Sequence, residues 1–120
     1  MMVLVDTSVW INHLRHGDAV LASALEEGNV LTHPFVIGEL ACGTLRGRAE
    51  ILRLLSELPQ APVASNAEVL AFIERRQLMG RGIGFVDAHL LASMTLAGSA
   101  RLLTSDRRLA AVATQLEGDQ

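Results

Sequence analysis

Short runs of apolar residues alternate along the chain with longer segments in which apolar residues recur at helical spacing. The short runs predict buried strands, and the periodic segments predict amphipathic helices. The expected strands cover residues 2–5, 30–32 and 101–104. The expected helices cover residues 7–14, 18–26, 34–45, 48–58, 65–79 and 85–96, and a final short helix starts at Asp106.

Residues at several boundaries favour these assignments. Asp18 is a typical N-cap, and Pro34 fits the first turn of a helix. Ser65 with Glu68 matches a capping box, and the glycine-rich run at residues 80–84 predicts a turn. Helices separate the strands, and no hairpin dipeptide joins two apolar runs. We therefore predict the α/β class, as a three-layer α/β/α sandwich with a short parallel sheet.

The length of the chain is enough for one small domain, and its composition indicates the kind of core. Its 120 residues are 50% hydrophobic and only 3% aromatic, so the core must consist mostly of aliphatic side chains. Cys42 is the single cysteine, which excludes an internal disulfide, and its apolar surroundings predict a small core residue. No basic leader precedes the first strand, and no apolar run reaches the ~18 residues of a membrane span. We expect a single domain over residues 1–120 in a soluble, cytoplasmic protein without a membrane partner.

The charge pattern leaves nucleic-acid binding open. The formal net charge is −3, and all ten basic residues are arginines. They include three clusters, at Arg46/Arg48/Arg53, Arg75/Arg76/Arg81 and Arg107/Arg108. Arginine can grip phosphate with two parallel hydrogen bonds, but solvated helix faces explain such clusters equally well.

Four acidic residues occupy unexpected places in the pattern. Asp6 ends the first expected strand, and Asp106 lies just past the last one. Glu39 and Asp87 interrupt segments that would otherwise read as buried helix. In parallel α/β sheets, ligands bind beyond the carboxyl ends of the strands. The four carboxylates therefore predict one acidic pocket at that edge.

Each acid also has a plainer explanation. Asp6 and Asp106 could cap the helices that follow them, and Asp87 could complement a helix dipole. Glu39 is harder to explain in this way, because it lies within an expected helix among apolar residues. Four separate explanations would be needed, whereas one pocket accounts for all four.

Clustered carboxylates repel one another unless a cation lies between them. Oxygen donors favour Mg²⁺ or Mn²⁺, and bound metal would attract a phosphate that bare carboxylates repel. Such metals generate a nucleophile from water and stabilise a leaving oxygen. The reaction indicated is hydrolysis of a phosphodiester.

Four motifs in a fixed order resemble one family. "LVDTSVWI", "GEL", "FVDAHLLA" and "LLTSDRRL" are similar to the motifs of PIN-domain ribonucleases, in particular the VapC toxins of bacterial type II toxin–antitoxin pairs. The resemblance implies a PIN-like fold and Mg²⁺- or Mn²⁺-dependent cleavage of RNA by an acidic quartet. Asp6 and Asp87 would be the principal metal ligands, Glu39 would complete the site, and Asp106 would support metal or water.

The resemblance also implies supporting residues and partners. Ser8 and Thr104 lie where the family often has hydroxyls that hold the acids or the phosphate, although capping alone would explain both. A neighbouring antitoxin and a homodimer are implied as protein partners. Asn12 departs from the family, because an acid is common at this place.

Other functions fit the same residues less well. A phosphatase with a covalent aspartate would need an acid at Ser8, and a phosphoacceptor receiver domain would need a lysine that the chain lacks. A PIN-like RNA- or partner-binding module without activity stays as the alternative, although the complete quartet argues against it. The mean hydropathy of +0.34 is high for a small domain. We expect a dimer mate or antitoxin to cover part of the face over residues 51–58, or of the helix before it.

Overall fold

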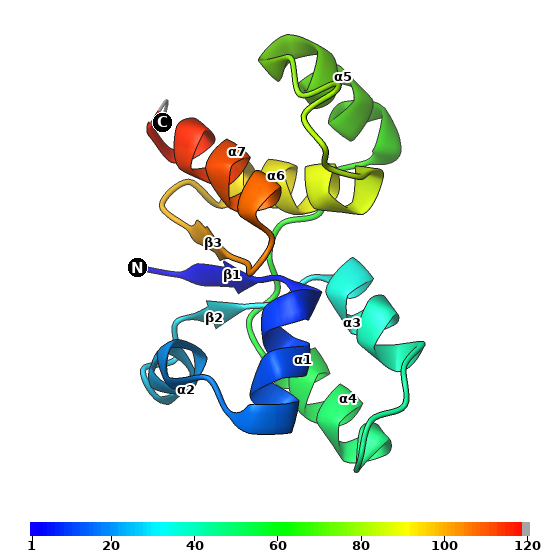
Figure 1. Ribbon diagram of the computed structural model, residues 1–120, viewed down its shortest axis with the longest axis vertical. Helices are drawn as coiled ribbons and strands as arrows, with labels where there is room; N and C mark the ends of the chain where they lie inside the picture. Colours follow the sequence, from blue (N-terminus) through cyan, green and yellow to red (C-terminus); the bar gives the residue numbers. More distant parts are fainter. Residues whose placement is uncertain (119–120) are drawn as a thin grey trace.

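The computed structural model describes residues 1–118 as a small parallel sheet surrounded by helices (Figure 1). In chain order the elements are β1 (Val3–Val5), α1 (Thr7–His16), α2 (Ala19–Glu26), β2 (Val30–Leu31), α3 (Pro34–Ala41), α4 (Arg48–Glu57), α5 (Asn66–Arg76), α6 (Phe85–Ala97), β3 (Arg101–Leu103) and α7 (Arg107–Gly118).

The sheet places β1 at its centre, in the order β2-β1-β3. Both neighbours pair with β1 in parallel, so Val3 lies opposite Val30 on one side and Arg101 on the other. Parallel strands end at the same edge of a sheet. Asp6 and Thr104, which follow β1 and β3, are therefore brought to one edge although 98 positions separate them in the sequence.

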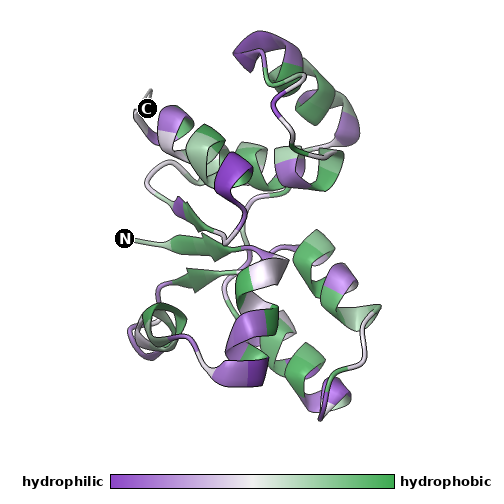
Figure 2. Ribbon diagram, viewed as in Figure 1, coloured by the Kyte–Doolittle hydropathy of each residue, from purple (hydrophilic) through white to green (hydrophobic). Residues whose placement is uncertain are grey.

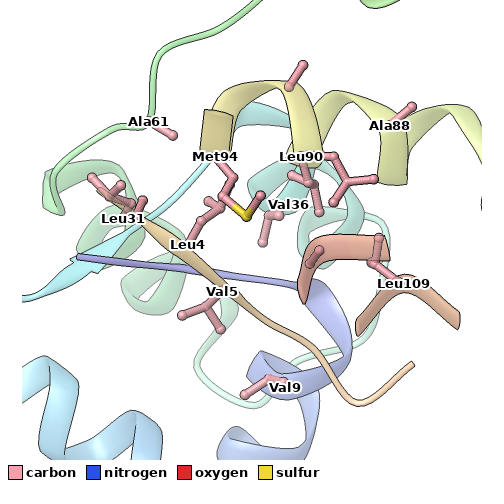
Figure 3. Packing of buried hydrophobic residues seen from close by; sticks show 14 of the residues in the cluster. Leu4, Val5, Val9, Leu31, Val36, Ala61, Ala88, Leu90, Met94 and Leu109 are labelled. Carbon is pink, nitrogen blue, oxygen red and sulfur yellow. The ribbon is translucent and has the colours of Figure 1, made fainter. Parts of the chain in front are cut away.

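Both faces of β1 are buried. Figure 3 shows Leu4 pointing toward Met94 of α6, whereas Val5 points to the other side, toward Val9 of α1. Successive side chains of a strand point to opposite faces, so burial of both Leu4 and Val5 requires helices on both faces. Figure 2 shows the strands coloured mainly as hydrophobic, as such a position requires. The predicted α/β class with layered helices is confirmed.

The predicted caps are present in the structure. Asp18 accepts a hydrogen bond from the backbone N–H of Leu21, which satisfies one free donor at the start of α2. The hydroxyl of Ser65 accepts from the N–H of Glu68, and the Glu68 carboxylate accepts from the N–H of Ser65. This reciprocal pair is the capping box predicted for α5.

Three helix ends differ most from the prediction, while the others agree within two residues. α3 stops at Ala41 rather than residue 45, because the N–H of Gly43 turns back to the carbonyl of Leu40. α5 stops at Arg76 rather than residue 79, because Gln77 adopts a left-handed conformation with φ of 55°. Glycine is the usual residue there, so Gln77 carried no signal in the sequence. α7 runs to Gly118 and is longer than expected, and residues 119–120 lie outside the description.

Two further features were not predicted. The proline-containing run after α4 pairs with the end of β2 through a parallel bridge between Thr32 and Gln60. Cys42 is exposed, so its prediction as a core residue was wrong. It lies just past the end of α3, where the helical pattern no longer turns it inward. Within residues 1–118, no helix combines the length and apolar character needed to cross a membrane.

Candidate active site

Asp6 is fixed by three hydrogen bonds at the carboxyl end of β1. Its Oδ1 accepts from the N–H of Thr7 at 2.8 Å. Its Oδ2 accepts from the hydroxyls of Ser8 at 2.9 Å and Thr104 at 2.7 Å. Only 8% of the residue is exposed, so these donors offset the cost of removing the carboxylate from water. Asp6 also stands at the N-cap of α1, as the plainer explanation expected.

Thr7 joins two of the four acids. While its backbone N–H binds Asp6, its hydroxyl donates to Oε1 of Glu39 at 2.7 Å. Glu39 belongs to α3, so this bond connects the start of α1 with a helix more than thirty positions further along. In the sequence, Thr7 stands at the start of an expected helix, which by itself indicates only a cap. A hydroxyl between two candidate acids was the available signal, but its partner depended on the packing of α1 against α3.

The segment after β3 is tied to the same carboxylate. Thr104 donates to Asp6 and its oxygen accepts from the N–H of Asp106 at 3.1 Å. Ser8 likewise donates to Asp6 and accepts from the N–H of Ser105 at 3.3 Å. The two hydroxyls therefore hold Asp6 and the loop that carries Asp106 together. Both hydroxyls hold an acid in this structure.

Asp106 and Asp87 have capping bonds as well. Oδ1 of Asp106 accepts from the backbone N–H groups of Arg108 and Leu109 at the start of α7. Oδ2 of Asp87 accepts from the N–H of Gly84 at the start of α6. Each cap uses one carboxylate oxygen. Within residues 1–118, the other oxygen of each acid accepts no hydrogen bond, and the same is true of Oε2 of Glu39.

The electrostatics of Asp87 indicate that the other three acids lie near it. Burial raises the pKa of the Asp87 carboxyl, and the hydrogen bond from Gly84 opposes that rise. The negative charges of Asp6, Asp106 and Glu39 raise the pKa further. A charge acts in this way only at short range, so the structure brings all four predicted acids together.

The donor set fits a hard divalent cation. It offers only carboxylate oxygens, which suit Mg²⁺ or Mn²⁺ better than softer metals. The capping bonds and metal binding are compatible, since three of the acids keep one oxygen free. In the described part of the chain, no three side chains of the metal-binding types already converge as a finished ligand set. The carboxylates would therefore have to rotate toward an ion.

Two buried histidines support the helices that carry Glu39 and Asp87. Nδ1 of His33 accepts from the N–H of Phe35 and so caps α3. His89 of α6 contacts His33 and Phe35 through ring faces and edges, and its Nε2 pairs with the Asn66 side chain. Burial and the nearby His89 lower the pKa of His33 to about 4. Both rings serve as structural groups that connect α3 and α6.

Comparisons with known proteins point the same way as this geometry. The PIN domain family matches residues 3–115. The chain is 51% identical to "Ribonuclease VapC32" of Mycobacterium tuberculosis strain CDC 1551 / Oshkosh over 114 residues, which cover 95% of this chain and 92% of the relative. The protein of the same name from strain ATCC 25618 / H37Rv gives the same values. This chain therefore belongs to the PIN-domain family, within its VapC group.

Proposed function

We propose that this chain is a Mg²⁺- or Mn²⁺-dependent endoribonuclease that acts as a single PIN-like domain in the bacterial cytoplasm. The observation that carries the proposal is a set of four carboxylates, in which the charges of three raise the pKa of the fourth, Asp87. Such a set is costly to the fold without a cation, and it is suited to phosphodiester hydrolysis with one. The relatives are named ribonucleases, which supports RNA as the substrate class.

In this proposal, Asp6 and Asp87 are the principal metal ligands, Glu39 completes the site, and Asp106 supports metal or water. When bound, the metal would lower the pKa of a water molecule and stabilise the leaving oxygen. Ser8 and Thr104 orient Asp6, and Thr7 orients Glu39, through the hydrogen bonds described above. Their task is to keep the carboxylates in place while the phosphodiester binds.

We further propose that the protein is the toxin of a toxin–antitoxin pair and forms a homodimer. An apolar groove of about 480 Å³ supports a protein partner. The residues lining it include Trp10, Leu14, Leu25, Leu54 and Leu58, from α1, α2 and α4 and from the position after α4. It contains the face over residues 51–58 that the sequence predicted to be covered by an antitoxin or a second copy.

The decisive test compares Asp6→Asn with Asp18→Asn. Both residues are N-caps, and asparagine caps a helix about as well as aspartate. Asp18 lies at the far end of α1, roughly 15 Å from Asp6 along a ten-residue helix. We expect the native protein and Asp18→Asn to cleave RNA when Mg²⁺ or Mn²⁺ is present and to stop when EDTA is added. Asp6→Asn should cleave RNA more than ~100-fold more slowly than the native protein.

The same assay distinguishes the proposed nuclease from a contaminating nuclease and from an inactive binding module. Equal cleavage by the native protein and Asp6→Asn would indicate a contaminating nuclease and would overturn the metal site. If the native protein, freed of antitoxin by unfolding and refolding, binds RNA but cleaves none with either metal, the chain is a binding module without activity. Calorimetric titration with Mn²⁺ provides a second readout, since Asp6→Asn should bind the ion more weakly.

A further inference from the structure

The side chain of Arg108 lies directly against Gly82. A Cβ atom placed on Gly82 would come within 2.5 Å of Cδ and 2.7 Å of Nη1 of Arg108, so no other residue fits there without moving the arginine. Gly82 also has φ of +80°, a conformation that favours glycine. The loop before α6 is thus shaped to receive this guanidinium group.

This contact lies between two segments that carry site acids. The backbone N–H of Arg108 donates to Asp106, so the arginine is anchored by one of the four carboxylates. Two residues beyond Gly82, the N–H of Gly84 donates to Asp87. α6 and α7 pack against each other, and Figure 1 shows them side by side on the same side of the sheet. Arg108 therefore sits at the rim of the acidic site.

Within residues 1–118, the guanidinium group of Arg108 makes no ion pair. Within residues 1–118, the ion pairs within 4 Å join Arg53 to Glu50 and Glu57, and none involves Arg108. Its side chain makes no hydrogen bond in the same range, although the residue is exposed. The charges that raise the pKa of Asp87 belong to Asp6, Asp106 and Glu39, and Arg108 does not offset them there. The N–H donors of the Arg108 guanidinium group are therefore unused, and the residue is exposed beside the acidic site.

We infer that Arg108 binds a phosphate of the RNA backbone next to the cleaved bond. The inference rests on the proposed ribonuclease function and adds to it the residue that grips the strand. Arginine matches the geometry of phosphate with two parallel hydrogen bonds, and packing against Gly82 removes much of the entropy that a free arginine would lose on binding. The four carboxylates need such a cation at their rim, because they repel the rest of an anionic strand.

The test measures the affinity of a labelled, mixed-sequence single-stranded RNA over a range of salt concentrations. The protein carries Asp6→Asn, so that no cleavage intervenes. Loss of one phosphate contact should reduce the slope of log affinity against log salt by about 0.7, and the affinity at low salt by about tenfold. Arg108→Gln should show both changes. Arg108→Lys keeps the charge and should keep the slope, with weaker binding because the fork is lost.

Arg107→Gln is the matched control, because it removes the same charge from the same turn of α7 without touching Gly82. It should leave the slope nearly unchanged. Equal effects of Arg107→Gln and Arg108→Gln would reduce the observation to general charge and would overturn the inference. Unchanged RNA binding by Arg108→Gln, with or without weaker binding of antitoxin, would overturn it too. The ribonuclease proposal is tested separately, by comparing RNA cleavage by the native protein and Asp6→Asn. It would therefore stand even if the inference about Arg108 failed.

Discussion

At the scale of single residues, capping a helix and belonging to the acidic cluster do not compete for Asp6, Asp87 and Asp106. Asp6, Asp87 and Asp106 each use a carboxylate oxygen to cap a helix start, and each also belongs to the acidic cluster. A carboxylate has about four lone-pair sites, so even the three hydrogen bonds that Asp6 accepts leave room for a metal. The sequence posed cap and metal ligand as alternatives, but capping a helix does not exclude metal binding by the same carboxylate.

Replacing Thr104 tests how strongly the hydroxyls position Asp6. Thr104→Val keeps the shape but removes the donor to Asp6 and the acceptor for Asp106. We expect Mn²⁺ affinity to fall by roughly 10- to 100-fold, the usual effect of losing a group that orients a metal ligand. Calorimetric titration of the folded protein measures this. Thr104→Ser retains the hydroxyl and is the control, and equal affinities for both variants would contradict the prediction.

Asp87→Asn should separate stability from activity. Asparagine can still accept the hydrogen bond from Gly84, but it removes the charge that burial and three neighbouring acids oppose. We expect a higher thermal midpoint in metal-free buffer and loss of RNA cleavage by more than ~100-fold. Lowering the pH should narrow the gap in midpoint, because the pKa of Asp87 is raised and its protonation relieves the same repulsion in the native protein.

Asp18→Asn is the control for this comparison. It makes the same chemical change at a helix start outside the acidic cluster, so its thermal midpoint should stay close to that of the native protein. A midpoint for Asp87→Asn at or below that of Asp18→Asn would show that repulsion at Asp87 does not burden the fold.

At the scale of elements, the starts of α3 and α6 are joined by aromatic rings. His33 caps α3 and contacts His89 of α6, while Phe85 of α6 and Phe35 of α3 both pack against His89. α3 carries Glu39 and α6 carries Asp87. The ring cluster therefore fixes the relative position of the two helices that hold those acids.

The pH dependence of stability should report this cluster. His33 has a pKa of about 4 in the folded protein, against an ordinary value of 6.5 in the unfolded chain. The unfolded chain therefore binds more protons between these values, and the free energy of unfolding should fall as the pH drops from about 6.5 toward 4. The loss from His33 is at most about 3 kcal/mol. Urea unfolding at a series of pH values measures it.

His33→Asn provides the matched variant, because asparagine can cap α3 but does not titrate. Its free energy of unfolding should be lower at neutral pH, where the ring contacts are lost, and should change less over the acid range. A slope between pH 6.5 and 4 equal to that of the native protein would assign the effect to other groups.

At the scale of the whole molecule, the four acids lie outside α1, α2 and α4, the helices that form most of the apolar groove. The acids gather at the carboxyl edge of the sheet, whereas α1, α2 and α4 contribute most of the groove. Leu54 lines that groove and is 49% exposed, while its neighbour Leu55 is buried. An exposed apolar lining of this kind is typical of a surface that a protein partner covers.

Leu54→Glu should weaken the complex with the proposed antitoxin by at least tenfold, because it places a charge in an apolar contact. Leu70→Glu is the control, since Leu70 is 58% exposed on α5 and does not line the groove. Light scattering of the mixed proteins gives the masses. A native protein that is monomeric alone would contradict the dimer, and an unchanged complex with Leu54→Glu would contradict antitoxin binding in the groove.

The sequence by itself determined the class of the fold and the identity of the acids. Apolar runs and cap residues are local signals, so the strands and the starts of α2 and α5 could be placed in advance. Asp6, Glu39, Asp87 and Asp106 stood out because a carboxylate in an apolar segment needs a reason. Local signals failed at Gln77 and Cys42, where the end of a helix depended on its packing.

Only the tertiary structure decided which groups meet. The bond from Thr7 to Glu39 and that from Thr104 to Asp6 join positions far apart in the chain, and parallel strands bring them to one edge. The contact between Arg108 and Gly82 likewise exists only because α7 packs beside the loop before α6. Residue types and spacing along the chain carry no distance between segments, so the partners of these side chains could be read only from the folded molecule.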